Sequence, residues 1–109
     1  LRYPINPDGT MGEREHWADT PQPSGPDGMC FAANGELLAA HFNGAGVDVF
    51  SPEGTFVDHI DIPGRFTTNC CFGGPDFSTL YVTDVDTKSV YSVELSIKGQ
   101  PLNDGRDYS

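Results

Sequence analysis

The amino-acid sequence predicts an all-β fold made of four-stranded antiparallel blades, as in a β-propeller. The first observation is punctuation: 13 Gly and 9 Pro residues divide the chain into short runs rich in β-branched and aromatic side chains, which is typical of strands joined by tight turns. The second is an internal repeat with a period in the low forties, the length of one propeller blade. No stretch of about ten residues keeps a helical apolar period without a Gly or a Pro, so we expect no helix.

The predicted strands follow one another closely, with a turn signal after each. They are Met29–Ala33, Glu36–Phe42, Val47–Ser51, Thr55–Ile60, Asn69–Gly73, Thr79–Thr83 and Ser89–Leu95. Two weaker runs precede them, at Leu1–Ile5 and Arg14–Ala18. We therefore expect the outer strands of one blade in residues 1–24, a complete blade in 25–66 and a terminal blade in 67–109.

The repeat consists of matching segments separated by similar intervals, and the small differences between the intervals indicate insertions in loops. Three pairs define it: Met29–Phe31 with Cys70–Phe72, Leu37–Ala39 with Leu80–Val82, and Gly46–Phe50 with Ser89–Val93. Within one period the strands change from apolar to polar. Met29–Ala33 is nearly all apolar, which predicts an innermost strand buried on both faces. Thr55–Asp61 is richly polar, which predicts an outer strand.

A Pro-acid-Gly triplet occurs three times, and its position in the repeat separates one copy from the others. Asp8 and Glu53 lie between the third and fourth strands of a blade, where such a triplet makes a hairpin turn. Asp27 follows the segment 20–25, which crosses from the rim of one blade to the centre of the next. Its repeat partner is Thr68, so the repeat itself does not require an acid. A carboxylate at the mouth of the central channel can bind a cation or act as a general base.

Charge and cysteine content limit the partners and the compartment. Sixteen acidic residues against six basic ones give a net charge of −10, which disfavours nucleic acid and anionic membrane surfaces as partners. The number of cysteines is odd, and none of them has a CxxC spacing. We therefore predict that Cys30, Cys70 and Cys71 are small buried thiols rather than parts of a disulfide framework or a zinc site. With no secretory signal at the start of the chain, these thiols predict a cytoplasmic protein. The start at Leu1 in strand-like sequence indicates a trimmed N-terminus.

Several short segments resemble one known family. They are Pro26–Cys30, Leu38–Gly44, Thr67–Gly74 and Leu80–Thr83, followed by Lys88–Tyr91 and Ile97–Leu102. Together they resemble the C-terminal part of the gluconolactonase/regucalcin (senescence marker protein) family. The resemblance extends from Tyr3 to Leu102 and is weakest before Gly25.

The resemblance implies a six-bladed propeller that hydrolyses sugar-type lactones with a divalent cation, whether Ca, Zn, Mn or Mg. It also implies that Asp27 is a metal ligand and the general base, because this residue matches the Asp of the family's Pro-Asp-Gly-Met segment. The family's other ligands, a Glu and an Asn, and a further Asn that contacts substrate lie in earlier blades. This chain holds about two and a half of six blades, and one carboxylate does not complete a Ca²⁺ or Zn²⁺ site.

Two functions therefore stay open. The first is a metal-dependent lactone hydrolase to which this chain contributes Asp27. The second is a non-catalytic, propeller-derived binding or assembly module that lacks the full metal site. In either case, copies of the chain that associate as a homo-oligomer would cover the open blade faces and complete a ring. An isolated chain is expected to be inactive unless other segments or copies supply the missing ligands.

Two further residues are candidates for contacting a small-molecule lactone. His41 ends a predicted strand at the same mouth as Asp27, where it lines a pocket or shuttles a proton; alternatively, it is a partly buried His bonded to a loop carbonyl. Asn69 begins the next inner strand and either points into the channel or caps the crossing loop. His16 and His59 are expected at the surface, and Trp17 is expected to pack between blades.

Overall fold

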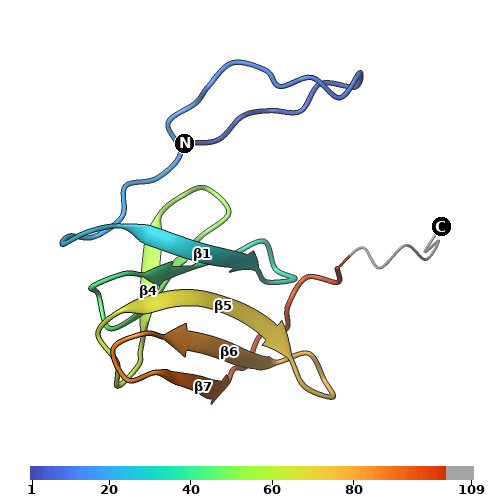
Figure 1. Cartoon of the computed structure of the whole chain (residues 1–109). Helices are drawn as coiled ribbons and strands as arrows, with labels where there is room; N and C mark the ends of the chain where they lie inside the picture. The colour runs from blue at the N-terminus through green and yellow to red at the C-terminus, as the bar shows by residue number, and fades with distance from the viewer. Residues whose placement is uncertain (103–109) are drawn as a thin grey trace.

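The computed structural model describes residues 1–102 and contains seven strands (Figure 1). They are β1 (Pro26–Phe31), β2 (Leu37–His41), β3 (Gly46–Phe50), β4 (Phe56–Asp61), β5 (Thr67–Gly73), β6 (Thr79–Asp84) and β7 (Ser89–Glu94). Each strand overlaps a predicted run, and their ends differ by a few residues at most. The described part of the chain has no helix. Residues 1–102 therefore contain no helix that is long and apolar enough to span a membrane.

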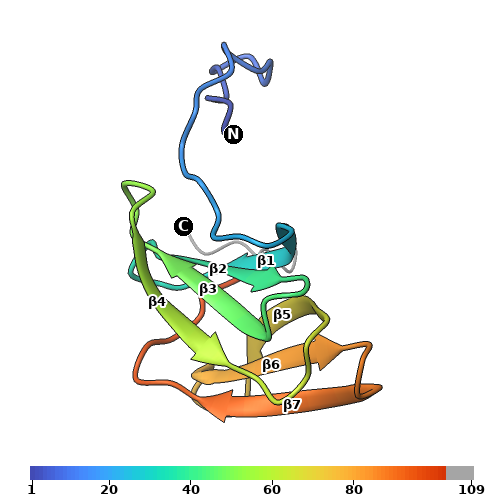
Figure 2. The same ribbon diagram turned by 90° about the vertical axis from the view of Figure 1, so that its left-hand side faces the viewer.

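The strands form two antiparallel sheets in which neighbours along the chain are neighbours in space. The first sheet has the order β1-β2-β3-β4, and the second has the order β5-β6-β7. The first strands of the two sheets, β1 and β5, lie side by side (Figures 1 and 2). This arrangement of consecutive meandering sheets is the blade architecture that the repeat predicts. The second sheet has three strands within the described residues.

The main core lies between the two sheets. In β2 and β3, Leu38, Val47 and Val49 point toward the second sheet, where Leu80 and Val82 meet them. The opposite face of the first sheet has a smaller cluster of Leu37, Ala39 and Phe50, which Trp17 and Ala18 cover. Both faces of β2 and β3 are therefore buried, as expected for the central strands of a sheet covered on both sides.

A β-bulge interrupts the first strand of each sheet at the same place in the repeat. In β1, the register shifts between Pro26 and Met29, whose partners are His41 and Ala39. In β5, it shifts between Thr67 and Asn69, whose partners are Asp84 and Thr83. The bulges contain Asp27 in one sheet and Thr68 in the other, which agrees with the pairing of these residues in the repeat. Bulges re-aim side chains and are frequent beside active sites.

Three local predictions are wrong. Leu1–Ile5 and Arg14–Ala18 are not strands: one isolated bridge joins them, Arg2 with Glu15, and a second joins Ile5 to Met11. The hairpin that these runs begin projects away from both sheets (Figures 1 and 2) before Trp17 and Ala18 reach the first sheet, and an isolated two-stranded hairpin without an apolar surface to cover is marginal in water. The innermost strand is also not buried on both faces, because β1 is a sheet edge with Met29 52% and Phe31 49% exposed. The division into 1–24, 25–66 and 67–109 stays a prediction.

Candidate functional site

Asp27 occupies the bulge at the beginning of β1, and its side chain is exposed. The strand starts there because Pro26 is still paired with His41 at the end of β2, while Gly25 accepts a hydrogen bond of 3.2 Å from the backbone N–H of Phe42. The extra residue of the bulge lies between these fixed points and the regular pairing that resumes at Met29. A mobile turn would not hold a carboxylate in this way, whereas a bulge anchored at both ends does.

Asn69 packs against Gly28, the residue after Asp27, because the two inner strands approach closely there. A Cβ placed on Gly28 would overlap the side-chain amide of Asn69, so this approach requires a residue without a side chain. The Oδ1 atom of Asn69 accepts a 2.9 Å hydrogen bond from the backbone N–H of Cys70. The Nδ2 group of Asn69 can then donate hydrogen bonds to another partner. The structure thus brings Asn69 next to the residue that follows Asp27.

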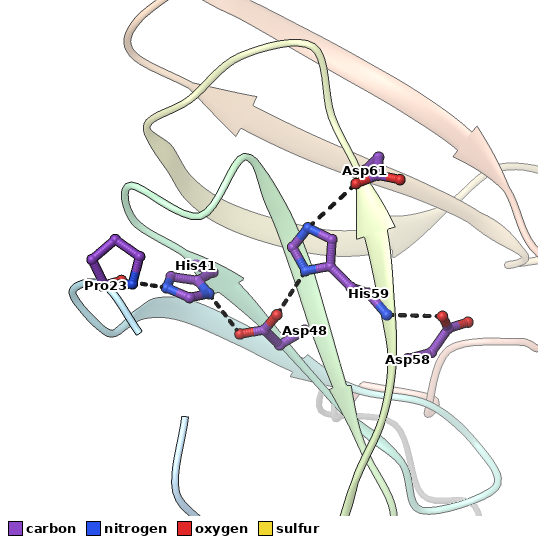
Figure 3. A network of polar contacts seen from close by, with 6 residues as sticks. All are labelled: Pro23, His41, Asp48, Asp58, His59 and Asp61. Atoms are coloured by element: carbon purple, nitrogen blue, oxygen red, sulfur yellow. Dashed lines mark hydrogen bonds and ion pairs between the residues drawn. The ribbon is translucent and has the colours of Figure 1, made fainter. Parts of the chain in front are cut away.

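His41 is buried, and both of its ring nitrogens contact acceptors (Figure 3). Nε2 lies 2.6 Å from the carbonyl oxygen of Pro23, and Nδ1 lies 2.8 Å from Oδ2 of Asp48. A carbonyl oxygen and a carboxylate only accept, so each ring nitrogen of His41 faces a hydrogen-bond acceptor. Gly44 permits the ring to lie here, since a Cβ at that position would overlap it. His41 therefore attaches the crossing segment before Asp27 to the centre of the first sheet.

Asp48 joins two histidines from different strands and is 2% exposed. Its Oδ2 faces His41 from β2, and its Oδ1 lies 2.7 Å from Nδ1 of His59 in β4 (Figure 3). The register places His59 directly opposite Asp48, and Gly46 leaves room for the imidazole, because a Cβ there would meet the His59 ring. A buried carboxylate is stable only when such partners compensate its charge.

Sequence reasoning missed Asp48 and misplaced His59. His59 was expected at the surface, but its side chain is only 27% exposed and contacts a buried carboxylate. The available signal was an acidic residue inside the apolar run of β3, since a charge there requires a buried partner. Trp17 was expected to pack between blades; it contacts Phe50 of the first sheet, at 6.2 Å between ring centroids, and its packing against a second blade stays a prediction. The prediction of three buried thiols is correct for Cys70 alone, because Cys71 is exposed and Cys30 is half-buried.

The described residues fit a divalent cation only in part. The exposed carboxylate of Asp27 is the hard oxygen donor that Ca²⁺, Mg²⁺ and Mn²⁺ prefer. Within residues 1–102, however, no group of three or more His, Cys, Asp or Glu side chains converges on one point. Asp27 therefore fits as one ligand of a set, and further ligands from outside residues 1–102 are needed for a closed site.

Comparisons with known proteins relate the chain to sugar lactonases. A 6-deoxy-6-sulfogluconolactonase from Pseudomonas putida is 40% identical over 84 residues, covering 75% of this chain and 29% of that protein. Regucalcin from Xenopus laevis is 49% identical over 59 residues, covering 53% of this chain and 20% of that protein. The chain thus spans less than a third of the length of these curated relatives.

Solved structures show the same relationship. The structure of a putative gluconolactonase superimposes with a TM-score of 0.79 at 31% identity, covering 93% of this chain and 33% of that one. A calcium-binding protein, regucalcin, from Agrobacterium tumefaciens superimposes with a TM-score of 0.72 at 27% identity, covering 82% of this chain and 35% of that one. These similarities confirm the predicted fold class and the predicted family resemblance. The family described as SMP-30/Gluconolactonase/LRE-like region matches residues 1–86, and the chain belongs to it.

Proposed function

We propose that this chain is part of a metal-dependent hydrolase of sugar-type lactones, to which it contributes Asp27 as a metal ligand and general base. The observation that carries the proposal is the exposed Asp27 carboxylate, held on a bulge with Asn69 packed against the next residue. Two relatives, from Pseudomonas putida and Haloferax volcanii, are named as a sulfogluconolactonase and a pentonolactonase. Similarity to a regucalcin described as calcium-binding supports a divalent cation.

Each residue has a specific part in the proposed reaction. A bound divalent cation supplies Lewis acidity that favours attack of water on the lactone carbonyl. Asp27 would hold this ion as one oxygen ligand, and its carboxylate accepts a proton from the attacking water. The ring C–O bond then breaks, and the proton returns to the leaving oxygen to give the hydroxy acid. Asn69 Nδ2 donates a hydrogen bond to a substrate oxygen.

His41 acts in this scheme as a positioning residue. Because Pro23 and Asp48 occupy both of its ring nitrogens, it holds the crossing segment rather than the lactone. The original expectation that His41 contacts the substrate directly stays a prediction. Direct contact requires one of these two hydrogen bonds to break.

Transplanting the chain into a relative tests the proposal. Residues 1–86, the range matched by the family, replace the corresponding segment of the Pseudomonas putida sulfogluconolactonase. We expect the transplanted enzyme to hydrolyse the host's lactone, to lose activity when a chelator removes divalent cations, and to regain it when cations are returned. Acid release in a pH-stat measures the rate, and light scattering confirms that the transplant keeps the native mass of the host.

The alternative, a non-catalytic assembly module, predicts a different result: the transplant folds with the mass of the host but hydrolyses no lactone. The observation that favours assembly is exposed apolar surface on the strands, where Met29, Tyr81 and Val90 are 52%, 39% and 67% exposed. Such surface favours association. That copies of the isolated chain form a homo-oligomer stays a prediction.

A further inference from the structure

We propose that Cys30 and Cys70 are a peroxide-sensitive thiol pair that closes a disulfide between the two sheets. Their Sγ atoms are 3.7 Å apart, although the residues are 40 positions apart in the chain. Both are free thiols in this structure. Neither thiol has a part in the proposed lactone chemistry.

Strand geometry explains why these two thiols meet. Cys30 lies in β1 and Cys70 in β5, the strands that contact each other across the interface between the sheets. Cys70 is buried in the main core, and Cys30 packs against the same cluster. Because side chains alternate along a strand, Cys71 points to the opposite face of β5 and is exposed. The sequence repeat pairs Cys30 with Cys71, so only the stacking of the sheets shows that Cys70 is its neighbour.

The two thiols differ in reactivity in a way that suits a nucleophile and its partner. The hydrogen bond with Cys70 lowers the pKa of the Cys30 thiol, although partial burial acts in the opposite direction. The same hydrogen bond, together with burial, raises the pKa of Cys70. Thiolate is the reactive form of cysteine. Cys30 is therefore the sulfur that attacks, and Cys70 remains a thiol beside it.

A small oxidant can reach this pair. Cys30 and Cys70 line a pocket of about 440 Å³, whose walls include Met29, Asn69 and Gln100. The pocket is large enough for hydrogen peroxide, whose size is close to that of water. Cys30 is also only half-buried, in contrast to Cys70 at 4% exposure. Oxidation therefore begins at Cys30.

The reaction balances with hydrogen peroxide as the oxidant. The Cys30 thiolate attacks one peroxide oxygen, the O–O bond breaks, and one water leaves after a proton is taken up, which gives a sulfenic acid. The Cys70 sulfur then attacks the sulfenic sulfur and loses its proton, the S–O bond breaks, and a second water leaves. Two thiols are oxidised to one disulfide, and one peroxide is reduced to two waters. The sulfurs must approach from 3.7 Å to about 2.05 Å.

The test uses the 109-residue chain, treated with hydrogen peroxide and then with an alkylating agent that caps the remaining thiols. We expect the free thiol count to fall from three to one, with the intact mass of the uncapped chain lower by two hydrogens. Peptide mapping should find Cys30 joined to Cys70 and Cys71 alkylated. The matched control is Cys71→Ser, which should form the same disulfide and leave no free thiol, whereas Cys30→Ser should form no intramolecular disulfide.

A repeat of the oxidation in urea separates a property of the fold from a property of the sequence. In the unfolded chain, the three thiols should pair without preference. The proposal is overturned if peptide mapping gives the same mixture of pairs with and without urea. It is equally overturned if Cys71 is the first thiol oxidised in the folded chain, or if all thiols are alkylated after peroxide treatment. None of these measurements depends on lactone hydrolysis.

Discussion

Replacing Asp27 by asparagine is expected to lower kcat for lactone hydrolysis by roughly 10²- to 10⁴-fold, the range for loss of a general base. The measurement uses the transplanted enzyme described above. Asparagine keeps the size of the side chain but cannot accept a proton from water, and it lacks the charge that favours a cation. Because the Asp27 side chain is exposed, the substitution should leave the stability of the sheet nearly unchanged.

The chain offers a control with the same local motif. Glu53 stands in the triplet Pro52-Glu53-Gly54, which makes a turn between β3 and β4, and its side chain is exposed. Glu53→Gln removes an acidic group of the same kind at the rim, so kcat should stay close to that of the unmodified transplant. Equal losses in the two variants would mean that the enzyme responds to total charge rather than to a carboxylate at position 27.

Replacing Asp48 by alanine is expected to lower the free energy of unfolding of the chain by about 3–5 kcal/mol, the typical cost of breaking a buried ion pair by removing one partner. Asp48 is 2% exposed and accepts from both His41 and His59. Its removal leaves the Nδ1 atoms of His41 and His59 facing a cavity without the carboxylate that now contacts them. Urea denaturation, followed by the fluorescence of Trp17, measures the change as a shift in the midpoint at an unchanged slope.

Asp61→Asn is the matched control for this prediction. Asp61 also lies near His59, but its Oδ1 is 3.6 Å from Nε2 and its side chain is 95% exposed. Exposed pairs of this kind contribute little, so we expect a change in unfolding free energy within about 0.5 kcal/mol. A loss from Asp48→Ala no larger than that from Asp61→Asn would show that the two histidines do not depend on the buried carboxylate.

Local pattern was enough to predict the strands, because each is short and bounded by turn formers. The same pattern failed for the N-terminal runs. Leu1–Ile5 has strand-like composition, but it has no neighbouring sheet on which to pack its apolar side chains, and this depends on tertiary structure. The prediction that β1 is buried on both faces failed for a related reason. Its apolar side chains need a covering surface on each face of the strand, and residues 1–102 leave the face with Met29 and Phe31 half exposed.

The repeat predicted the position of Asp27, and the family's Pro-Asp-Gly-Met segment implied its role. The repeat paired Asp27 with Thr68, and the two bulges occupy those positions. The contact between Asn69 and Gly28 could not be predicted, because it depends on how closely two sheets pack. The His41–Asp48–His59 group depends on the register of three strands, and a shift of one residue would turn Asp48 to the other face. Sequence composition does not set that register.

The most direct test of the central claim is to locate a bound cation in the transplanted enzyme, where the host supplies the further ligands that residues 1–102 lack. Sub-stoichiometric Mn²⁺ is added to the ¹⁵N-labelled transplanted enzyme, and paramagnetic broadening of each backbone amide signal is measured. The account predicts that Gly28 and Asn69 broaden first, that Asp27→Asn removes this effect, and that Glu53→Gln leaves it in place. Broadening that is centred on other carboxylates, or that persists at Gly28 in Asp27→Asn, would contradict the assignment of Asp27 as a metal ligand.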